Sequence, residues 1–462
     1  MTSLVAGVDV GGTFTDLVIL DPASGAVRLA KVPTSLPNQA PGVLAAFDAA
    51  GADLADVALI VHGTTTTTNA VLERALCKTG LITTAGFRDV LELGRRTRPQ
   101  PYGMTGTFRP VIPRDLRLEV PERMDAQGRV LTPLDEDALR HAIGQLIEMG
   151  CESLVIHFLH AYANPAHERR ACEIAREIWP NPYITCGHHL LSESREFERG
   201  VTAAVNASVQ PLLERYVTRL ADELAARGYT RDLLVMNGNG GMVDASKVSR
   251  EAVKTVMSGP ASGVMAALAT GRRAGFPNLL TYDMGGTSTD VAMIRAGRAP
   301  VSNEIEVEYA MPIHLPMVDV RTVGAGGGSI ARVDAGGMLR VGPESAGSIP
   351  GPICYGRGGA RVTISDANLI LGRLPADRFG TAADAARAAM QDQIATPLGL
   401  TVEAAAEAVI RIANTHMAGA IRMVSISLGA DPRDFALFAF GGAGPLHATA
   451  LARELAIPDV LI

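Results

Sequence analysis

An eight-residue segment occurs twice in this 462-residue chain and constrains the fold more than any other feature. Asp9–Asp16 has the sequence DVGGTFTD and Asp283–Asp290 has DMGGTSTD, so six of eight positions are identical. Each copy follows one apolar run and precedes another, which predicts an antiparallel hairpin with a Gly-Gly turn. The separation of 274 residues is too large for a solenoid repeat and favours two similar domains.

The rest of the chain alternates strand-like and helix-like patterns, which is typical of an α/β fold. We place the domain boundary so that one domain spans residues 1–205 and the other 206–462. Residues 88–129 are rich in Pro, Gly and Arg with little periodicity, which predicts an irregular insertion. Apolar runs predict strands over 57–61, 153–159, 233–236 and 435–440, and helical spacing predicts helices over 69–76, 135–149, 201–227, 261–271, 403–424 and 446–455.

Composition and charge exclude several classes of protein. A net charge of -6 argues against a general nucleic-acid binder and against a basic membrane-surface protein. No apolar run reaches the roughly 18 residues of a membrane helix, and Leu4–Val10 leads into a strand without a signal-peptide pattern. None of the five cysteines forms a C-x-x-C pair, and their small number predicts a reducing, cytoplasmic location.

Each Gly-Gly-Thr turn can bind an anion, because successive backbone N–H groups form a nest that suits phosphate oxygens. Asp9 and Asp283 end the preceding strands and would face that anion, so we expect a cation between them, Mg²⁺ or alternatively Mn²⁺. One such turn could equally be a structural hairpin, whereas two copies favour phosphate binding. For Asp16 and Asp290 a local backbone bond and a catalytic role both stay open. The phosphate-binding candidates are Gly11, Gly12, Thr13, Thr15, Gly285, Gly286, Thr287 and Thr289.

A third glycine-rich loop follows a predicted strand and opens a helix. Gly441, Gly442 and Gly444 would let a flat ring or a sugar lie against the backbone, and the helix N-terminus adds positive potential. We interpret His447, on that helix, as a packing or capping residue. A G-x-x-x-x-G-K-[ST] phosphate loop is excluded, because none of the four lysines follows a glycine.

These three loops on two similar domains resemble the actin, Hsp70 and sugar-kinase superfamily. The resemblance implies two ribonuclease-H-like domains around an interdomain ATP cleft, with both hairpins on the phosphates and Gly441–Gly444 on adenosine. The chain further resembles the hydantoinase A and 5-oxoprolinase family over most of its length. The specific stretches are HGTT at 62–65, GPESAG at 342–347, PGPICYGRGG at 350–359 and SDAN at 365–368.

The family resemblance implies an ATP-dependent hydrolase that phosphorylates the carbonyl oxygen of a lactam or cyclic amide. Asp9 and Asp283 would hold Mg²⁺ through water molecules. His62 could polarise the carbonyl or act as a base, or it could cap the following helix together with Thr64–Thr68. Two other functions stay open: the ATP-hydrolysing subunit of an acetone- or acetophenone-type carboxylase, and a nucleotide-gated binding module of the Hsp70 or actin type.

Several positions leave the substrate open. Gly238 stands where the resemblance leads us to expect serine, and Ser262 stands where we expect glycine. Arg95, Arg96 and Arg98 could bind a carboxylate or a phosphate, or form a solvated charge run.

The resemblance also implies a partner. Chains of this family extend well past the adenosine loop, whereas this one ends at Ile462, so we expect a truncated form. Cys354 lies in the glycine-rich signature, but no chemistry indicates a nucleophile there. Because we find no second active site for a labile phosphorylated intermediate, we expect a hydantoinase-B-like subunit and an oligomeric complex.

Overall fold

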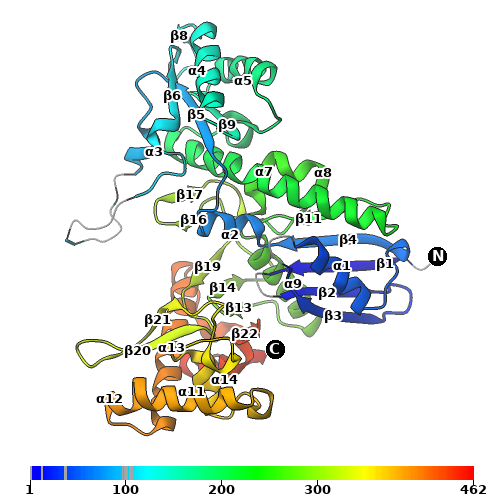
Figure 1. Cartoon of the computed structure of the whole chain (residues 1–462), viewed down its shortest axis with the longest axis vertical. Coiled ribbons are helices and arrows are strands. Elements are labelled where there is room, and N and C mark those ends of the chain that lie inside the picture. Colours follow the sequence, from blue (N-terminus) through cyan, green and yellow to red (C-terminus); the bar gives the residue numbers. More distant parts are fainter. Residues whose placement is uncertain (1–2, 12–13, 36–38, 96, 98–101, 104–107) are drawn as a thin grey trace. The chain divides into compact units, whose positions relative to one another are not determined.

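The computed structural model describes residues 3–11, 14–35, 39–95, 97, 102–103 and 108–462 (Figure 1). These form two compact units: unit 1 comprises the chain up to Ser262 together with Val301–Met317, and unit 2 comprises Gly263–Pro300 and Val318–Ile462. The predicted boundary between residues 205 and 206 falls inside helix α7, Glu196–Ala226, which belongs wholly to unit 1. The buried side chains of α7 contribute to two hydrophobic cores of unit 1, so a boundary within this helix does not match the compact units.

The first sheet of unit 1 carries the first copy of the repeat. Its strand order is β12-β11-β4-β1-β2-β3, in which β1, β2 and β3 are antiparallel neighbours and β4 and β11 run parallel to β1. Side chains alternate along β1, so that Leu4, Ala6, Val8 and Val10 are buried against the core. The strands are β1 Leu4–Val10, β2 Phe14–Leu20, β3 Val27–Pro33, β4 Val57–Thr64, β11 Leu233–Met236 and β12 Met242–Asp244.

A second, parallel sheet in unit 1 has the order β10-β9-β5-β6. Helices α4 and α5 lie beside it (Figure 1). Its strands β5 and β9 are buried at every position, as expected for a parallel sheet covered on both faces. The bounds are β5 Thr79–Thr84, β6 Arg117–Val120, β9 Ser153–His157, β10 Ile184–Cys186, α4 Glu136–Glu148 and α5 Ala166–Ile178.

The prediction of an irregular insertion over 88–129 is wrong for β6, which pairs with β5. The strand is only four residues long and begins with a fully buried arginine, so its sequence shows no apolar alternation. Arg117 is satisfied by hydrogen bonds to the Ile112 carbonyl and to the Glu92 carboxylate. Partners distant in sequence therefore make a charged residue acceptable in the core.

Unit 2 repeats the topology of the first sheet. Its order is β19-β14-β13-β22-β23, with β13, β14 and β19 antiparallel and β22 and β23 parallel to β13. This is the order and direction of β3-β2-β1-β4-β11 in unit 1. The prediction of an α/β fold with two ribonuclease-H-like domains is therefore confirmed. The bounds are β13 Leu279–Met284, β14 Thr289–Ile294, β19 Val320–Val323, β22 Ala436–Phe440, β23 Val460–Leu461, α13 Val402–Ser427 and α14 Gly444–Leu455.

The remaining elements are short, apart from α1, α9 and α11. The helices are α1 Ala40–Ala49, α2 Thr66–Leu72, α3 Val90–Leu93, α6 Gly187–Leu190, α8 Ala245–Val248, α9 Ser258–Ala274, α10 Ile364–Ile370, α11 Thr381–Met390 and α12 Thr396–Leu398. The strands are β7 Arg123–Met124, β8 Val130–Thr132, β15 Val301–Ser302, β16 Ile305–Glu308, β17 Met311–Ile313, β18 Met317–Val318, β20 Ser329–Val333 and β21 Leu339–Ser345.

A glycine segment in unit 2 supports the second hairpin. The N–H groups of Gly327 and Gly328 donate to the carbonyls of Gly285 and Gly286, at 3.0 and 2.6 Å. A Cβ atom at Gly326 would lie only 2.5 Å from the backbone of Thr287. The backbone of Gly326–Gly328 therefore packs directly against the hairpin turn, at a distance that is possible only because these residues lack side chains.

Two further features concern the cysteines and the helices. A disulfide joins Cys172 to Cys186, a pair that the cysteine spacing did not predict, while Cys77, Cys151 and Cys354 are free. No helix among the described residues combines the length and apolar character needed to cross a bilayer.

Candidate functional site

The first predicted phosphate turn begins at the end of β1, where Asp9 pairs across the hairpin with Asp16. Asp9 keeps an exposed surface, while desolvation and the negative charge of Asp16 raise its pKa and Lys31 lowers it. Asp16 forms an exposed ion pair with Lys31 at 2.8 Å. The neighbouring strand presents Gly63, whose Cβ would lie 3.1 Å from Oδ1 of Asp9. Gly12 and Thr13 lie outside the described residues, so their predicted phosphate contacts stay predictions.

The second turn leaves its backbone accessible. Gly285, Gly286 and Thr287 are exposed, and the preceding Asp283 is half-buried at the end of β13. Asp290 accepts a hydrogen bond of 2.6 Å from the Thr322 hydroxyl, and burial raises the pKa of this carboxyl. The two outgoing acids thus have different partners, a lysine in unit 1 and a hydroxyl in unit 2.

Two predicted phosphate ligands point inward instead. Thr15 is fully buried and its hydroxyl lies 3.2 Å from that of Thr34, which donates in turn to the Gly11 carbonyl. Thr289 is also fully buried, and its hydroxyl donates to the Ala325 carbonyl. In this geometry both hydroxyls stabilise the turns, because the strand alternation directs them into the core.

The predicted adenosine loop lies directly beside the second turn within unit 2. Strands β13 and β22 are parallel neighbours and pair Asp283 with Phe440, so Gly441 follows next to the carboxylate. Gly441 has a φ of +79°, and a Cβ there would lie 2.1 Å from Oδ1 of Asp283. The Ala443 N–H donates to the Met284 carbonyl at 3.0 Å. Asp283, the turn and Gly441–Gly444 therefore form one surface.

The Asp283 carboxylate of this surface fits a hydrated Mg²⁺ ion. No group of three or more His, Cys, Asp or Glu among the described residues is arranged to hold a metal by itself. Mg²⁺ usually binds through one or two carboxylates together with water and substrate phosphates, and does not need such a group. Asp283, in the space that glycine leaves at position 441, supplies oxygen ligands of the kind that Mg²⁺ prefers.

His62 does not occupy a surface that a substrate could reach. It is fully buried on β4, where its Nε2 lies 2.9 Å from the hydroxyl of Tyr216 on α7, and burial lowers its pKa to about 4. The prediction that it polarises a substrate carbonyl is therefore not supported. The capping alternative holds for Thr64, whose hydroxyl accepts the N–H of Thr66 at the start of α2 at 3.2 Å, whereas Thr65 makes no side-chain capping bond and His62 contacts α7. Tyr216, which the sequence did not single out, instead fixes the imidazole.

The sequence matches one known family over both halves of the chain. Residues 199–462 match the hydantoinase/oxoprolinase family, and residues 5–179 match the hydantoinase/oxoprolinase N-terminal region. The chain belongs to the hydantoinase/oxoprolinase family. It is 39% identical over 477 residues to the caprolactamase subunit alpha of Pseudomonas jessenii, covering 99% of this chain and 68% of that protein.

Two solved structures of this kind share the fold over the whole chain. The crystal structure of ATP-dependent caprolactamase from Pseudomonas jessenii has a TM-score of 0.85 at 37% identity, covering 99% of this chain and 68% of that one. Nucleotide-free acetone carboxylase also has a TM-score of 0.85, at 31% identity, covering 100% of this chain and 68% of that one. The hydantoinase/oxoprolinase fold is thus shared by relatives that act on different carbonyl compounds.

The arginines considered as substrate ligands have other partners or are not described. Arg95 forms a bidentate ion pair with Glu304, at 2.7 and 2.8 Å, and a further pair with Glu198 at 2.8 Å. Arg95 is therefore an exposed residue whose guanidinium is already paired with two carboxylates. Arg96 and Arg98 lie outside the described residues.

The family signature and the adenosine helix meet in a buried polar network of unit 2. His447 is fully buried; its Nδ1 donates to Oδ1 of Asn414 at 2.7 Å, and its Nε2 accepts from Nδ2 of Asn368 at 3.2 Å. Burial, with the nearby Arg373, lowers the pKa of His447 to about 4. The packing role predicted for His447 is confirmed. Cys354 is buried, and burial together with the negative charge of Asp366 raises the pKa of its thiol, which favours the protonated form.

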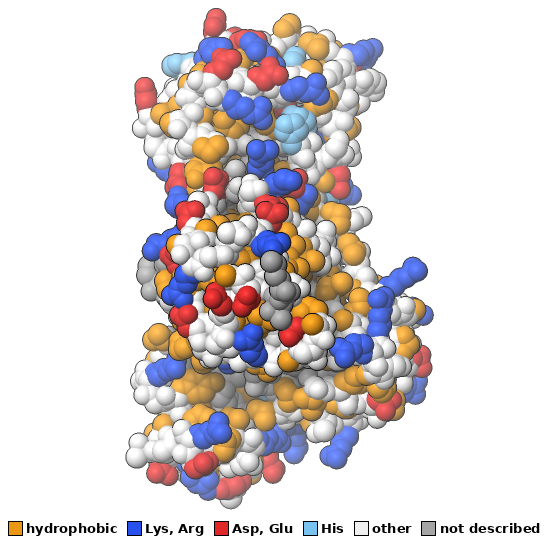
Figure 2. Space-filling view, turned by 90° about the vertical axis from the view of Figure 1, so that its right-hand side faces the viewer, with side chains coloured by type: hydrophobic (Ala, Val, Ile, Leu, Met, Phe, Trp, Pro, Cys, Tyr) orange, Lys and Arg blue, Asp and Glu red, His pale blue; other side chains and the backbone are white. Residues whose placement is uncertain are grey.

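The face shown in Figure 2 carries interspersed acidic and basic side chains without a continuous basic surface on it. The prediction that the chain does not bind nucleic acid stays a prediction.

The buried histidines make stability depend on pH. His62, His157 and His447 each have a pKa of about 4 in the folded chain, against 6.5 ordinarily. Between these values the unfolded chain binds more protons, so the free energy of unfolding falls as the pH falls from about 6.5 to about 4. The loss is on the order of 3 kcal/mol per histidine.

We expect His447→Gln to remove the contribution of His447 to this decrease, so that the free energy of unfolding depends less steeply on pH. Urea unfolding at several pH values measures the slope. His141→Gln, at an exposed position on α4, is the matched control and should retain the wild-type profile. If the free energy of unfolding of His447→Gln depends on pH as steeply as that of the wild type, the pKa of His447 is not lowered in the folded chain.

Proposed function

We propose that this chain is the ATP-using component of an amidohydrolase that activates a lactam or other small cyclic amide for ring opening. The observation that carries the proposal is the surface of unit 2. There, a Gly-Gly-Thr turn, the Asp283 carboxylate and a glycine loop at a helix N-terminus adjoin one another. Membership of the hydantoinase/oxoprolinase family and the similarity to an ATP-dependent caprolactamase support it.

The exposed backbone N–H groups of Gly286 and Thr287 would bind phosphate oxygens, whereas the Gly285 N–H donates to the Ser288 carbonyl at 3.0 Å and closes the turn. Gly441–Gly444 would lie against adenosine. In unit 1 the equivalent turn, with Asp9 at its start, would bind phosphate in the same way. In unit 2 the Asp283 carboxylate would hold Mg²⁺ through water molecules. When bound, Mg²⁺ neutralises the charge on the phosphate oxygens.

The proposed reaction begins with attack of the substrate carbonyl oxygen on the γ-phosphorus of ATP. The new O–P bond forms while the bond from phosphorus to the β,γ-bridging oxygen breaks, and ADP leaves. The amide N–H proton passes to water. The carbon of the resulting phosphorylated imidate is more electrophilic than that of the amide, so that water can add to it. The C–N bond then breaks, the nitrogen leaves as the protonated amine and the ring opens to an acyl phosphate. A second water attacks the acyl carbon, and inorganic phosphate leaves with the former carbonyl oxygen. The protein contributes mainly positioning and charge stabilisation to the phosphoryl transfer.

A ketone-activating role is the second candidate, because the fold matches acetone carboxylase as closely as it matches caprolactamase by TM-score. In that role the enolate oxygen of a ketone would accept the phosphoryl group. A nucleotide-gated binding module of the Hsp70 or actin type is less well supported, since the family match covers both halves of the chain.

We also propose that the chain works in the cytoplasm, in an oligomeric complex with a hydantoinase-B-like subunit. The similar caprolactamase chain is itself designated a subunit, which supports an assembly. A second subunit would receive the labile phosphorylated intermediate before water destroys it.

Asp283→Asn and Gly441→Ala should each weaken Mg·ATP binding by tenfold or more. The first removes the charge that faces the metal, and the second places a methyl group where the carboxylate lies. Isothermal titration calorimetry measures the affinities. Asp222→Asn, an exposed position on α7, and Gly144→Ala, which meets open space on α4, are the controls and should bind normally. Normal ATP binding by both site variants would contradict the nucleotide site.

ATP hydrolysis by the chain, assayed with its accompanying subunits, should rise on addition of lactams. A screen of lactams, hydantoins and ketones, the ketones with and without bicarbonate, distinguishes the candidates. Stimulation by cyclic amides supports the amidohydrolase, whereas stimulation confined to ketones with bicarbonate would replace it by the carboxylase function.

A further inference from the structure

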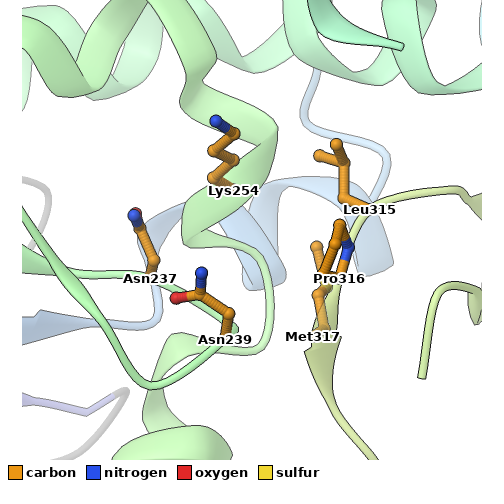
Figure 3. A pocket seen from close by; sticks show the side chains of 6 residues that line it. All are labelled: Asn237, Asn239, Lys254, Leu315, Pro316 and Met317. Carbon is orange, nitrogen blue, oxygen red and sulfur yellow. The ribbon is translucent and has the colours of Figure 1, made fainter. Parts of the chain in front are cut away.

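A cavity of about 140 Å³ lies in unit 1, next to the end of β11 (Figure 3). One wall is polar and consists of Asn237, Asn239 and Lys254. The opposite wall is apolar and consists of Leu315, Pro316 and Met317. Pockets for drug-sized ligands span roughly 300–1,000 Å³, so this cavity suits a much smaller molecule.

The cavity lies beside Gly238, the position at which the family resemblance leads us to expect serine. A Cβ at Gly238 would lie 2.4 Å from the Val256 carbonyl oxygen and 3.2 Å from Sδ of Met317. The Gly238 N–H donates to the Lys254 carbonyl at 2.7 Å, which holds this backbone against the polar wall. The serine expected at this position would not fit without a shift of the backbone. The observed backbone at this wall of the cavity therefore requires glycine at position 238.

The polar wall offers hydrogen-bond donors with little net charge. Oδ1 of Asn239 accepts the Gly241 N–H at 2.8 Å, which leaves its amide NH₂ for a ligand. Oδ1 of Asn237 is buried and accepts no hydrogen bond from the described residues, so the NH₂ is the accessible end of that side chain. The Lys254 ammonium donates to Glu251 at 2.7 Å, and this carboxylate offsets its charge.

We infer that this cavity binds the acceptor substrate, and that this substrate is a small, uncharged carbonyl compound with an aliphatic body. Its carbonyl oxygen would accept from Asn237 and Asn239, while its methylene groups would contact Pro316 and Met317. A ligand that also carries a carboxylate fits less well, because the apolar wall cannot solvate it and Lys254 is already paired. The inference rests on the proposed function and narrows it to unsubstituted lactams.

The strand register places this cavity at the same sheet edge as the first phosphate turn. Val235 pairs with His62, so Asn237, two residues further on, aligns with Thr64, which pairs with Val10. Strands lie about 4.8 Å apart, so two strand spacings, about 10 Å, separate Asn237 from the end of β1. Ligands of α/β folds bind at the carboxyl ends of parallel strands. The cavity and the Gly11 turn share such an edge.

Binding of ε-caprolactam to the full chain without nucleotide, followed by ligand-observed NMR, tests the inference. Asn239→Asp keeps the oxygen that bonds to Gly241 but replaces the NH₂ donor by a negative charge. We expect it to weaken ε-caprolactam binding about tenfold, a factor that one lost hydrogen bond and an added repulsion can produce. Asn278→Asp is the matched control: it is not part of the cavity wall, its oxygen likewise accepts a backbone N–H, from Ala296 at 2.8 Å, and binding should stay unchanged.

Two comparison ligands probe the chemistry of the site. Azepane, which has the same ring without the carbonyl, and 5-oxoproline, which adds a carboxylate, should both bind more weakly than ε-caprolactam. Equal or tighter binding of either one would overturn the inference. So would unchanged ε-caprolactam binding in Asn239→Asp, or no binding of ε-caprolactam to the wild-type chain.

ATP binding and lactam-stimulated ATP hydrolysis, measured on the same samples, separate this inference from the proposed function. Full stimulation in Asn239→Asp would reject the cavity and leave the function standing. A wild-type chain that does not bind ATP would reject the function, while ε-caprolactam binding would still decide on the cavity.

Discussion

The close approach of Asp283 to Gly441 is the contact on which the candidate nucleotide surface depends. Parallel pairing of β13 with β22 brings a carboxylate and a chain turn to the same edge. Only a residue without a side chain can occupy position 441, since a Cβ there would lie 2.1 Å from the carboxylate and φ is +79°. This contact determines the orientation of the acid, the path of the glycine loop and the start of α14.

The duplicated motif has the same backbone but different surroundings in the two units. In both hairpins the second threonine is buried and its hydroxyl stabilises the turn. The motif therefore contains structural residues as well as candidate binding groups. The outgoing acid differs: Asp16 forms an ion pair with Lys31, whereas Asp290 accepts a hydrogen bond from the Thr322 hydroxyl and burial raises its pKa. Two copies of one sequence can therefore carry unequal charge and serve unequal roles.

Much of the fold could be predicted from the sequence, because its signals are local. The paired motifs gave both hairpins, and the residues of β11, Leu233–Met236, coincide with the predicted strand. The glycine loop before α14 was likewise visible as a strand–turn–helix pattern. These features depend on periodicity and turn chemistry within a few residues of one another.

Features set by long-range contacts could not be predicted. The strand Arg117–Val120 forms by pairing with β5, and the buried imidazole of His62 has its hydrogen-bond partner in Tyr216, 154 residues away. The sequence around Arg95 does not indicate its ion pair, because the partner, Glu304, lies 209 residues away. The Gly326 contact gave no signal beyond a run of glycines, since its meaning lies in the hairpin that it touches.

The central claim is that the chain transfers phosphate to a carbonyl oxygen, and isotope transfer tests it most directly. A lactam labelled with ¹⁸O at the carbonyl is incubated with ATP, Mg²⁺ and the chain in the complex isolated from its native host. Mass spectrometry then determines the label in the released inorganic phosphate. Our account predicts that the carbonyl ¹⁸O leaves with the phosphate as the ring opens. Ring opening that releases only unlabelled phosphate would contradict it.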